Sequence, residues 1–252
     1  MDMKRFEGMN VVVTGAGSGI GAACVDRLTA EGATVVAVDL SQEAIDKLHE
    51  TYGTDRVKGV VLNVCDNAAA IQTIADKRKE LGPLRGIINC AGIAGTGGIA
   101  DVDLDVYRRA MAVNVDGTVN MCQAYVRAVQ NDEGDRSIVN FSSAAGILGV
   151  PNRVPYVAAK FAVSGISKSM SPELGPLGIR VNAIAPGMTK TPFIDYMLKE
   201  EGAEERFNAK HPIGRLAEPS EIAAVAVFLL TDDASFMTGS VVSVDGGQTA
   251  CI

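Results

Sequence analysis

The sequence predicts an α/β fold in which a mostly parallel, doubly wound sheet of seven strands carries helices on both faces. Short apolar runs alternate with segments of helical periodicity along the chain, and this alternation is typical of strand–helix units. The runs are continuously apolar rather than alternating with polar residues, which indicates strands buried on both faces. No repeat, low-complexity tract or linker divides the 252 residues, so we expect one domain over 1–252.

The strands are expected in the segments NVVVTG, TVVAVD, VKGVVLNV, GIINCAG, SIVNFSS, IRVNAIAPG and SVVSVDGG, in that order. Long helical segments are expected near 103–130, 155–175 and 219–231, the last with Pro219 in its first turn. The stretch 187–217 is a long insertion between the sixth strand and the last helix. It is interpreted as a lid over a binding site, with a surface helical hairpin as the alternative.

The composition argues against several classes of partner. The formal charge is −7, whereas nucleic acids and anionic membranes are bound by basic patches. No apolar run is long enough to suggest a membrane span, and the first residues lack the apolar segment of a signal peptide. The five cysteines are scattered without CxxC spacing, which favours a reduced setting without disulfides or a zinc site. We therefore expect a cytoplasmic protein that acts on a small molecule without a metal.

The segment TGAGSGIG, residues 14–21, lies directly between the first expected strand and the first expected helix. Glycines at this point let the backbone approach a pyrophosphate, and the N-terminus of the helix supplies N–H groups and a positive dipole. The alternative is a glycine-rich turn that binds no ligand. The candidate phosphate-binding residues are Gly15, Ser18, Gly19, Ile20 and Gly21.

Asp39 closes the second expected strand and is followed by Leu40. A carboxylate at this position accepts hydrogen bonds from an adenosine ribose and repels a 2′-phosphate. The neighbouring positions, among them Ala16, Ser18, Leu40 and Ser41, carry no positive charge that could offset this repulsion. The pattern predicts NAD rather than NADP as cofactor. The alternative is that Asp39 only caps the following helix.

Tyr156 and Lys160 lie one turn apart on an expected helix, in the segment VPYVAAKFAV. Taken alone, they could be an ordinary surface pair. A lysine ammonium beside a tyrosine favours the phenolate, and Pro155 in the first turn places Tyr156 near the positive end of the helix. A lowered pKa would make the tyrosine a usable acid and base near neutral pH. Two adjacent serines, Ser142 and Ser143, end a strand, and only one of them can face a substrate.

These segments together resemble the classical short-chain dehydrogenase/reductase family, over essentially the whole chain and in the same order. The motifs that carry the resemblance are the glycine spacing of 15–21, NCAG at 89–92, NVDG at 114–117, SIVNFSSAAG, YVAAK, IRVNAIAPGMTKT and VDGG. Cys90 stands where the family has a second Asn. The resemblance implies a Rossmann-type oxidoreductase that moves hydride between a nicotinamide and a secondary alcohol or ketone. It also implies a homotetramer or dimer built on the helices near 103–130 and 155–175.

The resemblance also assigns roles to single residues. The family's spacing from the tyrosine selects Ser143 as the group that binds the substrate oxygen, and Lys160 contacts the nicotinamide ribose. The backbone carbonyl of Asn114 is expected to hold a water in a proton relay. Asn63, with Val64 beside it, takes the place of the family's adenine-binding Asp. Further cofactor contacts are expected from Asn89, Ala91, Gly92, Pro186, Gly187, Thr189 and Thr191.

The substrate is the least determined part of the sequence reading. The candidate wall of its pocket is mostly apolar and comprises Ile93, Ala94, Ala145, Ile147, Val150, Met188, Phe193, Tyr196 and Met197. For each of these, plain packing is an equal alternative. Arg153, three residues before Tyr156, is a candidate for binding a carboxylate or phosphate, with a solvated surface arginine as the alternative.

Three functions fit the sequence. The first is an NAD-dependent secondary-alcohol dehydrogenase or carbonyl reductase. The second is a 3-oxoacyl-thioester reductase of the same family, acting on acyl carrier protein or coenzyme A thioesters. Those enzymes usually prefer NADP and carry basic residues near the glycine turn, which this chain lacks. The third is a non-catalytic NAD-binding regulator, although such proteins typically lose the tyrosine or the lysine.

Overall fold

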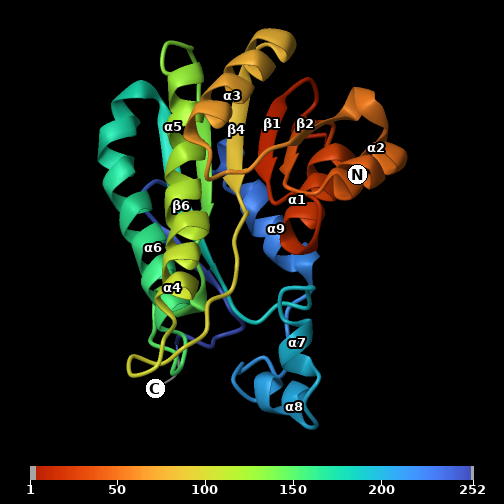
Figure 1. The fold of residues 1–252 in the computed structure, drawn as a ribbon. Coiled ribbons are helices and arrows are strands. Elements are labelled where there is room, and N and C mark those ends of the chain that lie inside the picture. The colour runs from red at the N-terminus through yellow and green to blue at the C-terminus, as the bar shows by residue number, and fades with distance from the viewer. Residues whose placement is uncertain (1–3, 251–252) are drawn as a thin grey trace.

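One sheet of seven strands forms the centre of the molecule, and all of its neighbouring strands run parallel (Figure 1). The structure is a computed structural model and describes residues 4–250. The strands are β1 (Asn10–Thr14), β2 (Thr34–Asp39), β3 (Val57–Val61), β4 (Leu84–Asn89), β5 (Arg136–Phe141), β6 (Ile179–Pro186) and β7 (Val241–Val244). Their order in the sheet is β3-β2-β1-β4-β5-β6-β7. The expected seven-stranded, doubly wound sheet is confirmed.

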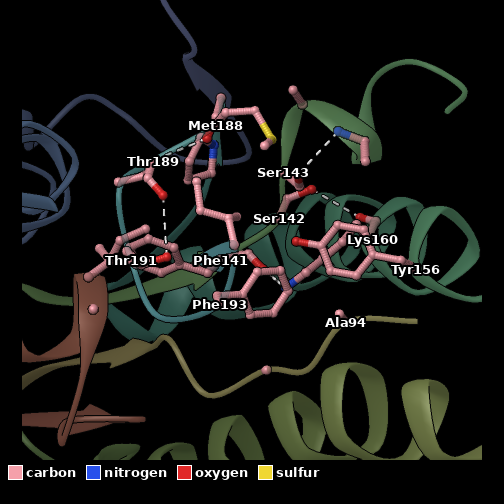
Figure 2. Close-up of a pocket in the computed structure, with 18 of the residues that line it drawn as sticks. Ala94, Phe141, Ser142, Ser143, Tyr156, Lys160, Met188, Thr189, Thr191 and Phe193 are labelled. Carbon is pink, nitrogen blue, oxygen red and sulfur yellow. Dashed lines mark hydrogen bonds between the residues drawn. The ribbon is translucent and has the colours of Figure 1, made fainter. Parts of the chain in front are cut away.

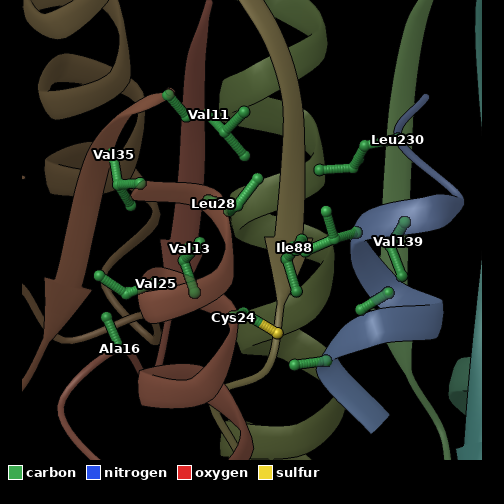
Figure 3. Close-up of a cluster of buried hydrophobic side chains, with 14 of the residues drawn as sticks. Val11, Val13, Ala16, Cys24, Val25, Leu28, Val35, Ile88, Val139 and Leu230 are labelled. Atoms are coloured by element: carbon green, nitrogen blue, oxygen red, sulfur yellow. The ribbon is translucent and has the colours of Figure 1, made fainter. Parts of the chain in front are cut away.

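Helices cover both faces of this sheet. The main ones are α1 (Gly19–Ala30), α2 (Gln42–Arg56), α3 (Asn67–Leu81), α4 (Leu104–Met111), α5 (Gly117–Val129), α6 (Val154–Leu174) and α9 (Pro219–Phe228). One buried cluster joins α1, α2 and α9 to the sheet (Figure 3), and the other joins α3 and α5 to the opposite face. The strand side chains alternate between the two clusters: Val11 and Val13 belong to the first and Val12 to the second. Both faces of the sheet are therefore covered by buried apolar side chains, as the continuous apolar runs predict.

The segment near 103–130, expected to be helical, is not one continuous α-helix. A π-helical turn, Ala112–Asp116, separates α4 from α5. Asn114 in this turn is 1% exposed, and its side chain makes hydrogen bonds that a regular helix surface would not offer. A wider turn of this kind is often found at a functional site.

The order of the strands reverses between β1 and β4, and ligands of such sheets bind outside the carboxyl ends of the strands at this point. Thr14, the last residue of β1, accepts hydrogen bonds with its Oγ1 from the backbone N–H groups of Cys90 and Ala91, both at 3.1 Å. The loops that follow the two strands are thereby held together. Two short helices, α7 (Asp195–Leu198) and α8 (Ala203–Asn208), project from the same end of the sheet (Figure 1).

No helix within residues 4–250 is long and apolar enough to cross a lipid bilayer.

The longest helix, α6, has serine at several positions that face the sheet, including Ser164, Ser167 and Ser171, which are all buried. Ser167 accepts a hydrogen bond from the Asn140 side chain at 3.0 Å and donates to the Val163 carbonyl at 2.8 Å. The contact between α6 and the sheet is thus partly polar and fully hydrogen-bonded at this point.

A hydrogen bond from the Tyr125 hydroxyl joins α5 to the sheet. Tyr125 is fully buried and donates to the Leu84 carbonyl at 3.0 Å. We expect Tyr125→Phe to lower the free energy of unfolding by about 1 kcal/mol, because a buried hydrogen bond is lost and the shape is kept. Tyr52→Phe is the control, since its hydroxyl meets Asp26 at the exposed surface. Urea denaturation should show a smaller loss for the control, and equal losses would contradict the prediction.

Candidate active site

A cavity of about 300 Å³ opens at the carboxyl ends of β1, β4, β5 and β6, beside the segment 187–217. Figure 2 shows that strand ends, α6 and the segment after β6 all contribute side chains to it. Its walls include most of the site residues expected from the sequence. Those of the glycine turn and the loop after β4 are Gly15, Ser18, Gly19, Ile20, Ala91 and Gly92.

The glycine turn has no room for a side chain at Gly15 or at Gly21. A Cβ on Gly21 would lie 1.9 Å from the Gly15 carbonyl oxygen, and a Cβ on Gly15 would lie 2.9 Å from the Ala91 Cα. Gly15 and Gly19 also have positive φ values of 63° and 52°. The turn leads into α1, whose first turn has no acidic residue and whose N-cap Ser18 makes no side-chain cap. The N–H groups at this helix end therefore fit a pyrophosphate.

Asp39 reaches back to the glycine turn from the end of β2. Its carboxylate accepts hydrogen bonds from the backbone N–H of Gly17 at 2.8 Å and of Ser41 at 3.0 Å. The following helix is capped by the Ser41 hydroxyl, which accepts from the Ala44 N–H. A carboxylate has acceptor sites beyond these two bonds. Asp39 is thus fixed in place and can still accept hydrogen bonds from a ribose.

Six residues expected to contact the cofactor do not line the cavity: Gly21 and Asp39, described above, and Leu40, Asn63, Val64 and Asn89. Leu40 is 70% exposed, and Val64 packs in the core beside Gly117. Asn63 is exposed and accepts the Cys65 N–H at 3.0 Å, so one acceptor position of its side chain is occupied. The side chain of Asn89 is buried and donates to Asn140 at 2.9 Å. The Asn89 side chain thus belongs to the interior between β4 and β5, and a cofactor contact from Asn89 stays a prediction.

Asn114 holds the loop after β4 in place. Its side chain accepts the Ile93 N–H at 3.2 Å and donates to the carbonyls of Ile93 and Ala110 at 3.0 and 2.9 Å. Its own carbonyl accepts the Thr118 hydroxyl at 2.8 Å. A Cβ on Gly92 would lie 2.7 Å from the Asn114 side-chain oxygen. The structure thus gives Asn114 a positioning role through its side chain, which the sequence reasoning did not include.

The two serines at the end of β5 differ in their surroundings. The Ser142 hydroxyl is buried against α6, where it donates to the Lys160 carbonyl at 3.0 Å and lies 2.7 Å from the Ser164 hydroxyl (Figure 2). The Ser143 hydroxyl accepts the Ala145 N–H at 3.1 Å, and Ser143 lines the cavity together with Tyr156 and lowers the pKa of its phenol. Of the two, Ser143 is therefore the serine beside the tyrosine, as the family spacing implies.

Tyr156 is held as a neutral phenol. Burial raises the pKa of Tyr156 to about 12, and the Ser143 hydroxyl and the positive charge of Arg153 only partly oppose this rise. The Phe193 ring lies 5.8 Å from the Tyr156 ring, between centroids, and adds apolar surroundings (Figure 2). The expected lowering of the tyrosine pKa by Lys160 is wrong for this structure, because desolvation outweighs the charges nearby.

Lys160 is 5% exposed and donates from Nζ to the Phe141 carbonyl at 2.8 Å. Its Nζ lies 5.6 Å from the centroid of the Tyr156 ring. Burial lowers the pKa of Lys160 to about 8. The two side chains come from one face of α6, as their spacing predicts, but the ammonium group is bound to the sheet rather than to the phenol.

The two ends of the segment 187–217 are tied to each other. Thr189 and Ala217 form a parallel bridge, with hydrogen bonds from Lys190 N–H to Ala217 O at 2.9 Å and from Ala217 N–H to Met188 O at 3.0 Å. His211 accepts the Met188 N–H with Nε2 at 3.2 Å, and its Nδ1 lies 2.8 Å from the Phe207 carbonyl. The segment therefore returns to its own start and covers the cavity as one unit.

Most of the residues expected from this segment line the cavity. They are Pro186, Gly187, Met188, Thr189, Thr191, Phe193, Tyr196 and Met197. The hydroxyls of Thr189 and Thr191 donate to the backbone carbonyls of Gly187 and Thr189. The Thr191 methyl lies 3.2 Å from where a Cβ on Gly19 would be, so it packs on the glycine turn. From the other side, Ala94, Ala145, Val150 and Arg153 complete the wall.

Some lining residues were missed by the sequence reasoning. They include Cys90, Phe141, Ile194, Phe207, Lys210 and Gln248. Ile93 and Ile147, which were expected in the wall, do not line it. Gln248 follows β7, so its position at the carboxyl end of a strand was the available signal. Phe207 and Lys210 carried no signal, because the fold of the insertion 187–217 decides which of its side chains face inward.

Comparison with known proteins agrees with this geometry. A family model described as Enoyl-(Acyl carrier protein) reductase matches residues 15–249. The chain is 39% identical to 2,5-dichloro-2,5-cyclohexadiene-1,4-diol dehydrogenase of Sphingobium indicum, over 98% of this chain and 100% of that protein. It is 36% identical to meso-2,3-butanediol dehydrogenase of Serratia marcescens, over 98% and 96%.

The chain belongs to the short-chain dehydrogenase/reductase family. The crystal structure of levodione reductase superimposes on it with a TM-score of 0.92, at 33% identity, covering 98% of this chain and 100% of that one. Its relatives in this family are oxidoreductases, and such proteins generally bind a nicotinamide cofactor. The glycine turn with its free helix N-terminus fits the pyrophosphate of that cofactor, and the Asp39 carboxylate fits its ribose.

The buried position of Lys160 predicts a pH dependence of stability. Its folded-state pKa of about 8 lies below the ordinary 10.5, so the unfolded chain binds more protons between these values. Stability of the wild type should therefore gain up to about 3 kcal/mol from this group as the pH rises from about 8 to 10.5. In Lys160→Met this gain should be absent. The measurement is urea denaturation at several pH values.

Lys168→Met is the matched control, because Lys168 is exposed on the same helix. Its stability should follow the wild-type pH dependence. A Lys160→Met profile parallel to the wild type across this range would contradict the prediction.

Proposed function

We propose that this protein interconverts secondary alcohols and ketones with NAD(H) as the hydride carrier, through Ser143, Tyr156, Lys160 and Asn114. One observation supports this most: the Ser143–Tyr156 pair lines the same cavity as the glycine turn. The bound nicotinamide would supply or accept the hydride. The cofactor would lie along Gly15–Ile20 and the loop after β4, which would bring its reactive end to the tyrosine.

In ketone reduction the residues of the chain supply the proton and stabilise the developing charge. The neutral Tyr156 phenol donates its proton to the carbonyl oxygen as negative charge develops there. The Ser143 hydroxyl donates a hydrogen bond to the same oxygen, and it also favours the phenolate that Tyr156 becomes. In alcohol oxidation the tyrosine has to lose its proton first. The positive charge of Lys160, 5.6 Å from the ring centroid, favours that anion.

The position of Asp39 supports NAD over NADP. Its carboxylate is held against the Gly17 N–H at 2.8 Å, so it cannot swing away from a 2′-phosphate without breaking this bond. The adjoining side chain, Leu40, is exposed and neutral. A phosphate on the ribose would therefore meet a fixed negative charge with no cation beside it.

The chain would act as one catalytic domain, with residues 187–217 as a lid that excludes water from the reaction. Two of its relatives are named as diol dehydrogenases, which supports a secondary alcohol as the substrate. We also propose a homotetramer or dimer formed through α4, α5 and α6. The exposed apolar side chains of Val119 on α5 and Phe161 on α6 support this surface.

The second candidate is reduction of 3-oxoacyl thioesters, which the 36% identity to a 3-oxoacyl-[acyl-carrier-protein] reductase of Thermotoga maritima favours. The absence of basic neighbours at Asp39 argues against the NADP preference usual for that reaction. Reduction of acetoacetyl-CoA with NADPH at a rate above that of any alcohol or ketone would favour this candidate. A regulator without activity is favoured if NAD binds but no alcohol in a broad panel is oxidised.

Tyr156→Phe tests the proton donor. We expect turnover to fall by at least about a hundredfold, because a positioned acid or base contributes on this scale. Binding of NADH should stay within about threefold, since the ring itself remains, and fluorescence titration of NADH measures it. Tyr52→Phe, remote from the cavity, should keep full activity. Comparable turnover in Tyr156→Phe and the wild type would overturn the assignment.

Asp39→Asn tests the choice of cofactor. The amide keeps an acceptor for the Gly17 N–H but removes the negative charge. We expect the wild type to use NAD more efficiently than NADP, and the substitution to shift the ratio of kcat/KM values toward NADP by about 10- to 100-fold. Steady-state kinetics with both cofactors measure this ratio. A wild type that prefers NADP would refute the proposal.

A further inference from the structure

The charge of the cavity is opposite to that of the chain. The chain carries a formal charge of −7, yet no Asp or Glu among residues 4–250 lines the cavity. Three basic residues line it instead: Arg153, Lys160 and Lys210. Low-dielectric walls with charges of one sign focus a positive potential into such a space. Lys160 has a part in the proposed proton transfer, whereas Arg153 and Lys210 have none.

Arg153 has only neutral partners in the structure. Its guanidinium donates from Nη1 to the Tyr196 hydroxyl at 2.7 Å and from Nη2 to the Met197 sulfur at 3.4 Å. It also lies over the Tyr196 ring, 5.8 Å from the centroid. None of the ion pairs found within the described part of the chain involves Arg153. A guanidinium offers more N–H donors than these two contacts use.

Arg153 is also fixed close to the reacting group. It precedes the first turn of α6 and pairs with Gly97 in a parallel bridge, with Val154 N–H bonded to Gly97 O at 3.1 Å. Tyr156 follows three residues later on the same helix, and both side chains line the cavity. A group bound by Arg153 would therefore belong to the same small molecule that meets Tyr156.

Lys210 supplies a second positive charge from the lid. It follows α8 and lies 5.2 Å, Nζ to ring centroid, from Phe207, another lining residue. Like Arg153, it forms none of the ion pairs found within residues 4–250. Tyr196, Met197 and Lys210 all belong to the segment 187–217, so the lid contributes both a cation and the groups that hold Arg153.

We propose that the substrate is a short-chain secondary alcohol or ketone with an anionic oxyacid group, such as a carboxylate or sulfonate, which Arg153 binds. The planar fork of a guanidinium matches two oxygens of such a group, and Tyr196 orients this fork from the lid. This inference rests on the proposed function, because it names the substrate class of the same site. Lys210 adds to the attraction without a fixed contact.

The test compares 3-hydroxybutyrate with its uncharged methyl ester as substrates of the full-length protein with NAD. We expect the wild type to have the higher kcat/KM for the acid. In Arg153→Gln the ratio of the acid's kcat/KM to the ester's should fall about 10- to 100-fold, as loss of a hydrogen bond to a charged group predicts. Arg153→Lys should recover part of this ratio. Arg127→Gln, an equal charge change at an exposed position of α5, should leave the ratio unchanged.

Tyr196→Phe removes the hydroxyl that orients Arg153 and keeps the ring. It should raise KM for the acid more than for the ester, with little change in kcat. An equal effect of Arg153→Gln on both substrates would mean that Arg153 only holds the lid, and this would overturn the proposal. Weakened NADH binding in Arg153→Gln, to the same extent as the loss of the ratio, would assign Arg153 to the cofactor and also overturn it.

A binding measurement separates failure of this inference from failure of the proposed function. Butyrate and methanesulfonate cannot be oxidised as alcohols, so titration calorimetry with the NAD-loaded protein measures anion binding alone. We expect binding by the wild type and at least about tenfold weaker binding by Arg153→Gln. Anion binding through Arg153 without turnover of any alcohol would uphold the site and refute the oxidoreductase proposal. Turnover of neutral alcohols with no anion binding would refute the anion site and uphold the oxidoreductase proposal.

Discussion

The close approach of two loops at the carboxyl ends of β1 and β4 is the constraint on which the rest of the site depends. Gly15 packs against Ala91 so closely that no Cβ fits between them, and the Thr14 hydroxyl accepts two N–H groups of the same loop. The first loop begins the glycine turn and the second leads to Gly92. The Asn114 side chain then holds the next residue, Ile93, by both of its backbone polar groups. One chain of short contacts thus connects the glycine turn at one end of the cavity to the π-helical turn.

These loops also form part of the surroundings in which Lys160 is buried beside Tyr156. Lys160 is desolvated, and the Phe141 carbonyl and the charge-free loop around Gly92 are its immediate surroundings. Its pKa and that of Tyr156 shift in opposite directions for one reason, because burial disfavours the charged form of each. The neutral phenol is therefore the stable form. Forming a phenolate beside the ammonium restores a charge pair in a low-dielectric site, so each group makes the other's charge less costly.

Local patterns predicted the fold and much of the site because each depends on residues close in the sequence. The strands follow from continuous apolar runs, the glycine turn from its position between a strand and a helix, and the Tyr156–Lys160 pair from one turn of helix. The direction of the Tyr156 pKa shift was not predictable in this way. It depends on burial under Phe193, which comes from an insertion whose conformation no periodicity fixes. The positions of two other side chains were not predictable from local patterns either. Lys210 belongs to the same insertion, and the Asn89 side chain packs on Asn140 of another strand.

The lid proposed for residues 187–217 would also explain why a mostly apolar wall can suit the proposed charged substrate. Phe193 and Tyr196 are 39% and 46% exposed in this structure, and closure of the proposed lid over a substrate would bury them. A salt bridge formed away from water is stronger than one at the surface. A guanidinium already held by a phenol and a thioether loses little further freedom when an anion arrives. With the proposed lid closed, an uncharged alcohol would leave that guanidinium without a counter-ion, which carries a desolvation cost. Discrimination would therefore arise from the penalty for the neutral molecule as well as from attraction of the anion.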